Sequence, residues 1–338
     1  MMSYVLLLVG FVLLIKGADY FVEGSSSVAK LLKVPSVIIG LTIVAMGTSA
    51  PEAAVSITAG LNGSNAIALG NVVGSNIFNL LMVLGLCAVV NPVPVEKSFI
   101  KRDFPMTIGA SFLLLLFAFT GMQVGHLEGG IMLVLFAGFI LLMVRSALQG
   151  RAEASEEEEI KVLSPLMSLI YIVGGLIAVV FGGDLGVDSA TAIAQSLGLS
   201  ENFIALTIVA MGTSLPELVT SLVASRKGEC GLAVGNVVGS NLFNILLVLG
   251  MSCALSPIAV GMENLIDIAF SILVHFIMLA FCASGKEIKR WEGVIAVAIY
   301  FAYMISLFMR KHTATTRKPP FFGTGVLFCY RRPSSAMM

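Results

Sequence analysis

Ten apolar stretches of membrane-spanning length divide this sequence, and short loops with Pro, Gly or charged residues separate them. A helix needs about 20 mostly apolar residues to cross the hydrocarbon core of a bilayer. The pattern therefore predicts an all-α membrane protein with ten transmembrane helices. The stretches are residues 4–24, 35–60, 65–90, 104–121, 128–147, 163–184, 201–225, 230–254, 264–283 and 292–309.

The composition excludes the soluble class. Hydrophobic residues make up 57% of the chain and charged residues 12%, whereas soluble domains carry roughly 25% charge. The net charge is zero, so we expect no nucleic-acid partner, and the lipid bilayer becomes the expected surroundings. The first stretch lacks a basic leader and a small-residue cleavage site, so we expect it to remain as a membrane span.

The distribution of Lys and Arg predicts how the helices are inserted. Loops after the odd-numbered stretches hold thirteen such residues when Arg145, at the end of the fifth stretch, is counted with its loop, and loops after the second, fourth, sixth and eighth hold none. Because short cytoplasmic loops carry the excess of positive charge, we expect a multi-pass protein of the cell inner (plasma) membrane with both termini outside. The basic residues after position 309 oppose this orientation, but C-terminal charges override earlier spans only in some proteins.

An internal repeat underlies the ten stretches. LTIVAMGTSAPE at 41–52 recurs as LTIVAMGTSLPE at 206–217, and GNVVGSNIFN at 70–79 recurs as GNVVGSNLFN at 235–244. The offset is 165 residues, and 28 of the 45 positions in 41–85 match their partners in 206–250. Each copy holds five stretches, an odd number, so the second copy is predicted to be inverted in the membrane. Inverted repeats place a substrate site near the bilayer midplane, where the copies meet.

The repeat also sets the predicted domain organisation. The first inverted repeat covers residues 1–150 and the second covers 163–310. Residues 151–162 form a short acidic cytoplasmic loop, which we interpret as solvated because it lacks the Asp and Gly spacing of a Ca²⁺-binding loop. Residues 311–338 have neither span length nor periodicity, and we predict a disordered tail there.

Two acidic residues lie inside predicted spans at matching positions of the two copies. Glu52 and Glu217 share their stretches with no Lys or Arg, and an ionisable group there costs at least about 2.5 kcal/mol. Their partners must then be protons or metal cations, and a protonated pair with a structural role is the alternative. Asp19, in the first span, is predicted to pair with Lys16 three residues before it.

The residues around each Glu suit a hard cation. Thr48, Ser49, Thr213 and Ser214 place hydroxyl groups within one helical turn of the carboxyls. A Pro directly before each Glu leaves the backbone carbonyl four residues earlier without its helical N–H. Carboxylate, hydroxyl and carbonyl oxygens are the ligands of Ca²⁺. No Cys or His lies close in sequence, which argues against zinc or copper.

The second motif supplies further oxygens. Ser75 and Asn79 are four residues apart and share a helix face, as do Ser240 and Asn244. We interpret these four residues as cation ligands. Two interpretations stay open for the remaining amides, cation binding and hydrogen bonding between closely packed helices. Those amides are Asn71, Asn76, Asn236 and Asn241.

The duplicated motifs, GTSAPE with GNVVGSNIFN and GTSLPE with GNVVGSNLFN, resemble the two alpha-repeats of the sodium/calcium exchanger (cation/calcium antiporter) family in its compact prokaryotic form. The resemblance covers the chain to about residue 310. It implies an antiporter that exchanges three Na⁺ for one Ca²⁺ by alternating access, as the first and sixth spans slide past the rest. The implied ion ligands are the backbone carbonyls of Ala45 and Ala210 and the side chains of Thr48, Ser49, Glu52, Ser75, Asn79, Thr213, Ser214, Glu217 and Ser240.

This chain departs from part of the family at one position. Some prokaryotic members carry Asp where Asn244 stands here, which gives them a third acid, and other members also have Asn. We predict Asn244 as a ligand from the helix face that it shares with Ser240.

Other functions compete with this interpretation. A Ca²⁺/H⁺ exchanger or a K⁺-dependent cation exchanger of the same fold would use the same two carboxyls. An intramembrane hydrolase would need two Asp residues at a scissile bond, without Ser, Thr and Asn oxygens around each. A channel would carry Ca²⁺ regardless of Na⁺. We therefore expect no enzyme and no cofactor, with Ca²⁺ and Na⁺ as the transported partners of a functional monomer.

Overall fold

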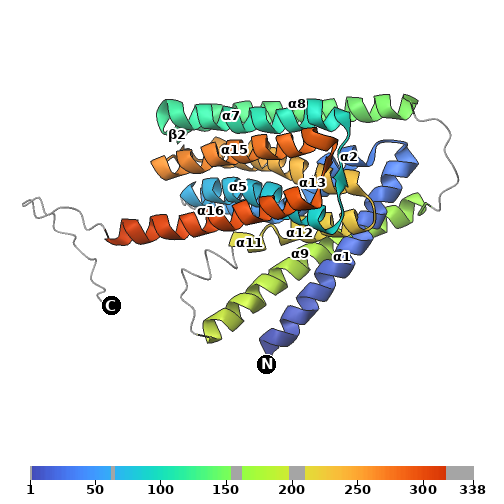
Figure 1. The fold of residues 1–338 in the computed structure, drawn as a ribbon, viewed down its shortest axis with the longest axis horizontal. Coiled ribbons are helices and arrows are strands. Elements are labelled where there is room, and N and C mark those ends of the chain that lie inside the picture. The colour runs from blue at the N-terminus through green and yellow to red at the C-terminus, as the bar shows by residue number, and fades with distance from the viewer. Residues whose placement is uncertain (1, 62–64, 154–161, 198–209, 317–338) are drawn as a thin grey trace, which may run out of the picture. The chain divides into compact units, whose positions relative to one another are not determined.

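The structure is a computed structural model that describes residues 2–61, 65–153, 162–197 and 210–316. Almost all of these residues are helical, and the four strands have two residues each (Figure 1). A compact unit ends at Tyr300, inside the last helix. All of the packing described below lies within this unit.

The elements of the first half end in a long helix that reaches Glu153. Its helices are α1 (Met2–Leu32), α2 (Ser36–Ile39), α3 (Ala45–Thr48), α4 (Ala50–Leu61), α5 (Asn65–Phe78), α6 (Leu84–Val90), α7 (Phe104–Gly121) and α8 (His126–Glu153). Its π-helical turns are η1 (Gly40–Val44), η2 (Asn79–Val83) and η3 (Phe99–Asp103), and its strands are β1 (Val93–Pro94) and β2 (Gln123–Val124).

The second half follows a similar order. Its helices are α9 (Pro165–Ser196), α11 (Ala210–Gly212), α12 (Leu215–Arg226), α13 (Cys230–Phe243), α14 (Gly250–Leu255), α15 (Met262–Gly285) and α16 (Arg290–Thr316). It contains the π-helical turn η5 (Asn244–Leu249) and the strands β3 (Ile258–Ala259) and β4 (Glu287–Ile288).

Eight helical spans of the described residues are long and apolar enough to cross a membrane, and a bent helix pair makes a ninth if it counts as one span. This confirms an all-helical, multi-pass membrane protein. The predicted span 201–225 is described only in part: residues 201–209 lie outside the described residues, and α11 and α12 follow them.

The bent pair joins α2, η1 and α3 to α4 at an angle of 50°. The break falls at Ser49, whose backbone (φ −83°, ψ 7°) leaves the helical region directly before Ala50 and Pro51. Since proline lacks an N–H and its ring clashes with the preceding turn, the sequence GTSAPE interrupts the span at membrane depth. Irregular backbone is tolerated there when protein surrounds it, and Ser49 is buried.

Several sequence predictions were wrong in detail. The first and sixth spans are longer than predicted, because α1 extends to Leu32 and α9 to Ser196. The predicted tail begins too early, since α16 continues to Thr316; residues 317–338 lie outside the described residues, as does 154–161 of the acidic loop. Asp19 pairs with Lys227 (3.0 Å) rather than with Lys16, because the loop between α12 and α13 lies against α1.

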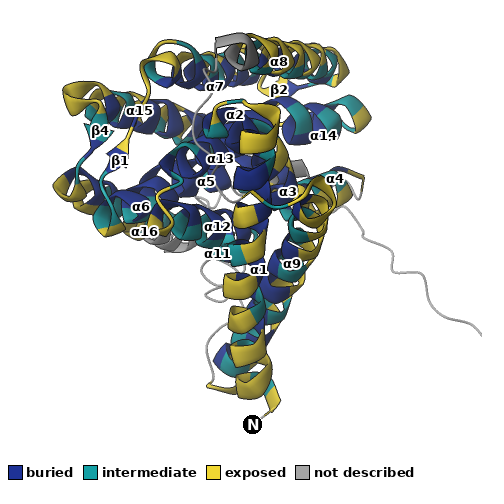
Figure 2. Ribbon diagram, turned by 90° about the vertical axis from the view of Figure 1, so that its right-hand side faces the viewer, coloured by how far each residue is buried: buried dark blue, intermediate teal, exposed yellow. Residues whose placement is uncertain are grey.

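The two motif helices form the centre of the compact unit. In an apolar 18-residue stretch of each span, 94% of the residues are buried for Cys230–Leu255 and 78% for Ile67–Val90. The corresponding share for His126–Gln149 is 17%. Figure 2 shows this contrast between α13 and the exposed side of α8. Apolar surface that faces outward is stable in lipid but not in water, so the polar motifs are buried within protein and the peripheral helices face the bilayer.

Close backbone contacts hold the motif helix α13 and the helix α1 in place. A Cβ added at Gly239 of α13 would lie 2.7 Å from the Leu41 carbonyl oxygen, so only Gly permits this crossing with η1. Helices α1 and α9 run antiparallel and equally close: a Cβ at Gly175 would lie 2.5 Å from the backbone nitrogen of Phe21. Small residues at such positions are the usual means of helix association in membranes.

Two short strand pairs join the halves. β1 pairs with β4, with Val93 opposite Ile288, and β2 pairs with β3, with Val124 opposite Ile258. β1 and β2 belong to the first copy of the repeat, and β3 and β4 belong to the second, so each pair takes one strand from each copy. β3 lies 165 residues after β1, at the equivalent position. The strands tie the ends of the central helices of one half to the other half.

Candidate functional site

Both motif carboxyls lie in the first turn of a helix that begins after a break. Glu52 follows the break at Ser49 in α4, and Glu217 follows Ser214 in α12. Each side chain is completely buried. The unpaired N–H groups and the dipole at a helix N-terminus favour an anion, which offsets part of the cost of holding a carboxylate at this depth.

Hydroxyl groups of one half donate to the carboxyl of the other half. Ser49 Oγ donates to Glu217 Oε1 (2.9 Å), and its mate Ser214 Oγ lies 2.9 Å from Glu52 Oε1. Ser214 Oγ also lies 3.1 Å from Ser75 Oγ of the first half, whereas Ser240 Oγ, 3.4 Å from Glu217 Oε1, belongs to the same half as that carboxyl. The two Glu residues are therefore held by crossed contacts between the copies of the repeat.

The Thr residues of the first motif also contact the other half. Thr48 Oγ1 lies 3.0 Å from Asn236 Oδ1, and the Asn236 amide donates to Ser221 Oγ (2.9 Å). The mirrored contacts are Thr213 Oγ1 to Asn71 Oδ1 (3.5 Å) and Asn71 Nδ2 to Ser56 Oγ (2.9 Å). These amides bind Thr and Ser hydroxyls, which favours the helix-joining interpretation for Asn71 and Asn236.

Four buried acceptor oxygens of the site have no hydrogen-bond partner among the described residues: Glu52 Oε2, Glu217 Oε2, Asn79 Oδ1 and Asn244 Oδ1. Among the described residues, no other buried carboxylate or side-chain amide oxygen lacks a hydrogen-bond partner. Glu52 and Glu217 are related by the offset of 165 residues, and so are Asn79 and Asn244. Because an unsatisfied buried acceptor costs about 1–3 kcal/mol, four in symmetric positions indicate a partner from outside the protein.

The chemistry of these oxygens identifies the class of partner. Lys30, Arg102 and Lys227 form ion pairs with other acids, and none of these pairs involves Glu52 or Glu217. No cluster of three or more His, Cys, Asp or Glu residues occurs in the described part of the chain. Two carboxylates surrounded by hydroxyl and amide oxygens suit a hard cation such as Ca²⁺ or Na⁺, and not a soft transition metal.

Comparison with known proteins agrees with this site. Residues 2–145 and 167–309 match the family model described as "Sodium/calcium exchanger protein". The chain belongs to the sodium/calcium exchanger family. The matched residues include both motif pairs, and the gap between the two ranges contains the acidic loop.

Full-length relatives of this exchanger are known from bacteria and archaea. The sodium/calcium exchanger MaX1 of Methanosarcina acetivorans is 34% identical over 347 residues, with 90% of this chain and 98% of that protein covered. The inner membrane protein YrbG of Escherichia coli is 31% identical, with 91% and 97% covered. A solved structure of the sodium-calcium exchanger NCX_Mj, soaked with Na⁺ and Ca²⁺, is 32% identical with a TM-score of 0.78 and covers 91% of this chain.

The structure places several of the predicted ligands of this exchanger around the two buried carboxyls. Ser214 contacts both Glu52 and Ser75, Ser49 and Ser240 contact Glu217, and Thr213 contacts Asn71. The Ala45 carbonyl accepts the N–H of Ser49 (3.0 Å) at the helix break. Ala210 is the first residue of α11, in the position that mirrors Ala45. The role of each of these residues as an ion ligand stays a prediction.

Sequence reasoning missed two features of the exchanger's site. The π-helical turns η2 and η5 begin at Asn79 and Asn244, and π-turns inside helices often occur at functional sites. The cross-repeat partners of the Ser and Thr hydroxyls were also not predicted. The only sequence signal for either is that Asn ends both copies of the GNVVGSN(I/L)FN motif.

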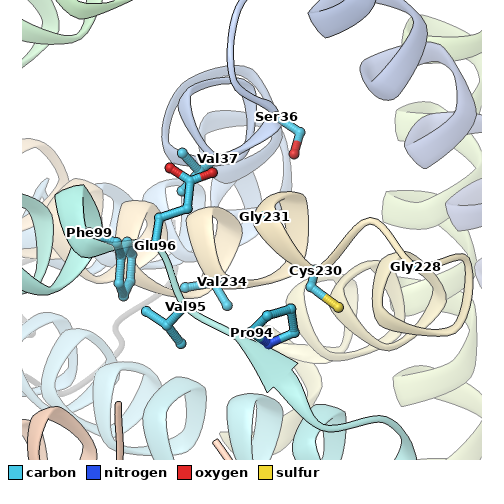
Figure 3. A pocket seen from close by; sticks show the side chains of 10 residues that line it. All are labelled: Ser36, Val37, Pro94, Val95, Glu96, Phe99, Gly228, Cys230, Gly231 and Val234. Carbon is cyan, nitrogen blue, oxygen red and sulfur yellow. The ribbon is translucent and has the colours of Figure 1, made fainter. Parts of the chain in front are cut away.

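A cavity of about 350 Å³ lies next to the start of α13, but it does not coincide with this network. Figure 3 shows its lining, with Ser36, Glu96 and Cys230 as the polar side chains among apolar ones. None of the predicted ligands lines it. The predicted ligands of the exchanger therefore lie among the buried polar side chains and not in this open cavity.

Proposed function

We propose that this chain is a secondary active antiporter that exchanges Ca²⁺ for Na⁺ across the cell inner membrane by alternating access. The observation that carries the proposal is the set of four buried, unpartnered oxygens of Glu52, Asn79, Glu217 and Asn244. Two carboxylates balance the charge of one Ca²⁺ or of two Na⁺, so the same site suits both ions in turn. Ca²⁺ takes 6–8 oxygen ligands, and the neighbouring hydroxyls and backbone carbonyls would complete its shell.

The proposed architecture is ten transmembrane helices in two inverted repeats, with the ions near the midplane and both termini outside. Crossed contacts such as Ser49 to Glu217 and Ser214 to Glu52 support it, as do the two strand pairs, each of which takes one strand from each half. All proposed ligands come from a single chain, so we propose a monomer. Exchange of bound ions requires neither a cofactor nor an enzymatic step.

We also propose that α1 and α9 move as one unit relative to the rest. Their backbones are in direct contact at Gly17 and Gly175, and Figure 1 shows the two helices side by side and inclined to the other long helices. Lys227 connects α1 to the rest of the unit through Asp19 (3.0 Å) and Glu23 (3.7 Å). Partly exposed ion pairs of this kind contribute about 0–1 kcal/mol each, so they can break during transport.

Opposite insertion of the repeats predicts opposite labelling of two equivalent corners. Met122 and Lys286 are the exposed, left-handed residues that end α7 and α15. In a background without native cysteines, Met122→Cys should react with an impermeant thiol reagent from outside, and Lys286→Cys only from inside, because one loop carries no Lys or Arg and the other carries three. Reaction of both from the same side would contradict the inverted arrangement.

The decisive experiment is Ca²⁺ uptake into liposomes that contain the purified protein. We expect uptake of ⁴⁵Ca²⁺ when Na⁺ inside exceeds Na⁺ outside at equal pH, and no uptake above protein-free liposomes when Na⁺ is replaced by choline. Potassium is varied separately. Because three Na⁺ for one Ca²⁺ moves net charge, uptake should respond to a membrane potential set with valinomycin.

The other outcomes correspond to the competing functions. Uptake driven by a pH gradient without Na⁺ would make the chain a Ca²⁺/H⁺ exchanger, and a requirement for K⁺ would make it a K⁺-dependent exchanger. Ca²⁺ flux that ignores both gradients would indicate a channel. Any of these results would replace Na⁺/Ca²⁺ exchange as the function.

A further inference from the structure

Four Asn side chains form a closed set where the two repeats meet. Asn76 of α5 and Asn241 of α13 lie three residues before Asn79 and Asn244, which begin η2 and η5. All four are buried. Asn79 and Asn244 are predicted ligands with unpartnered oxygens, whereas the sequence leaves the role of Asn76 and Asn241 open.

Main-chain carbonyls fix the orientation of the first two amides. Asn76 Nδ2 donates to the backbone oxygen of Asn241 (3.3 Å), and Asn241 Nδ2 donates to the backbone oxygen of Asn76 (3.3 Å). A carbonyl oxygen can only accept, so the NH₂ group of each amide must face it. The Oδ1 atoms of Asn76 and Asn241 must therefore point away from these carbonyls, and a flipped amide would place two acceptors in contact.

This orientation passes to the predicted ligands. Asn76 Oδ1 accepts a hydrogen bond from Asn244 Nδ2 (3.2 Å), and Asn241 Oδ1 accepts one from Asn79 Nδ2 (3.1 Å). Each ligand amide thus uses its NH₂ group on the other repeat. Its remaining polar atom is the Oδ1 atom that has no partner among the described residues.

We propose that Asn76 and Asn241 are positioning residues that aim the carbonyl oxygens of Asn244 and Asn79 at the transported cation. The proposal rests on the exchange function proposed above and extends it to two residues that do not bind the ion. The orientation matters because a reversed ligand amide would present N–H groups, which repel a cation. The Asn76 and Asn241 amides are fixed by main-chain carbonyls. They keep the Oδ1 atoms of Asn244 and Asn79 free to face the cation before the cation binds.

The proposal is tested by measuring the ion affinity of single and double mutants. Asn76→Leu keeps the volume and leaves the backbone oxygen that Asn241 uses, but removes the acceptor of Asn244. We expect its half-saturating Na⁺ and Ca²⁺ concentrations to rise about tenfold, the effect of one lost orienting hydrogen bond, with a maximal rate within about twofold of the parent.

Double mutants distinguish a positioning role of Asn76 from a packing role. In the Asn244→Ala background, Asn76→Leu should cause no further loss of ion affinity, because the oxygen that Asn76 positions is absent. In the Asn79→Ala background, Asn76→Leu should multiply the loss of affinity, because the partner of Asn79 is Asn241. Asn91→Leu is the matched control, since the Asn91 amide also donates to a backbone carbonyl of the other half, that of Ser225 (3.3 Å), but has no contact with the ligand amides.

Parental ion affinity in Asn76→Leu, an equal loss in Asn91→Leu, or a multiplied loss with Asn244→Ala would each overturn the proposal. Should Asn76→Leu not fold, Asn241→Leu combined with Asn79→Ala provides the mirrored test with the same expectations. Failure of the exchange function is a different result, because the parent protein itself would then show no Na⁺-dependent Ca²⁺ flux.

Discussion

Glu52→Gln and Glu217→Gln should each reduce Na⁺-driven Ca²⁺ uptake by a hundredfold or more. Each carboxyl supplies one of the two charges that balance Ca²⁺, and no other acid contacts the network in the described residues. Removing one partner of a buried charge pair costs about 3–5 kcal/mol, and about 1.4 kcal/mol corresponds to a factor of ten. The Gln side chain keeps the size and one acceptor oxygen, so the fold should be retained.

The control for these variants is a buried acid outside the network. Glu292 is 1% exposed, accepts hydrogen bonds from the Lys289 backbone N–H (2.7 Å) and from Ser284 (3.0 Å), and lies at the start of α16. Glu292→Gln should keep uptake close to the parent value in the same liposome assay. Parental uptake in either Glu52→Gln or Glu217→Gln would remove the two carboxyls from the ion site.

Ser49→Ala and Ser214→Ala should each raise the half-saturating Ca²⁺ concentration by about ten- to a hundredfold. Each variant removes a hydroxyl at 2.9 Å from the carboxyl of the opposite repeat. Hydrogen bonds to charged groups contribute about 1.5–3 kcal/mol. Because Ser214 also contacts Ser75 (3.1 Å), its replacement should have the larger effect of the two.

Ser111→Ala serves as the matched control for the loss of a buried serine. Ser111 is 2% exposed and its hydroxyl donates only to the Thr107 carbonyl (3.0 Å) of its own helix. Its replacement should leave Ca²⁺ affinity unchanged. If Ser49→Ala had the same affinity as Ser111→Ala, the crossed hydroxyl contacts would have no part in ion binding.

The sequence alone predicts the residues of the site better than their contacts. Glu52 and Glu217 stand out because a duplicated acid in an apolar span has few explanations. The helix break at Ser49 was predictable from Pro51, since the chemistry of proline is local. The pairing of Ser49 with Glu217 joins residues 168 positions apart, and no local pattern encodes which repeat supplies each donor.

Other features depended on packing that the sequence does not display. The π-turns at Asn79 and Asn244 insert one extra residue per turn without any Pro or Gly to announce it. The pairing of Asp19 with Lys227 replaced the local partner Lys16, because tertiary packing brings a loop 208 residues away against α1. Helix ends such as Ser196 extended beyond the apolar stretch, since helical hydrogen bonding continues past the residues that fit a bilayer.

The crossed contacts also restrict how such a protein could have arisen. A single copy of the repeat would contain Glu52 and Asn79 but neither the hydroxyl that contacts that Glu nor the oxygen that accepts the Asn79 amide, since both belong to the other copy. A half-length ancestor could complete this constellation only by associating with a second molecule of itself. Gene fusion would then have made that association permanent, and afterwards a substitution at Ser49 in one half would act on Glu217 in the other. The two halves thus depend on each other at these positions, as two separate subunits would at a shared interface.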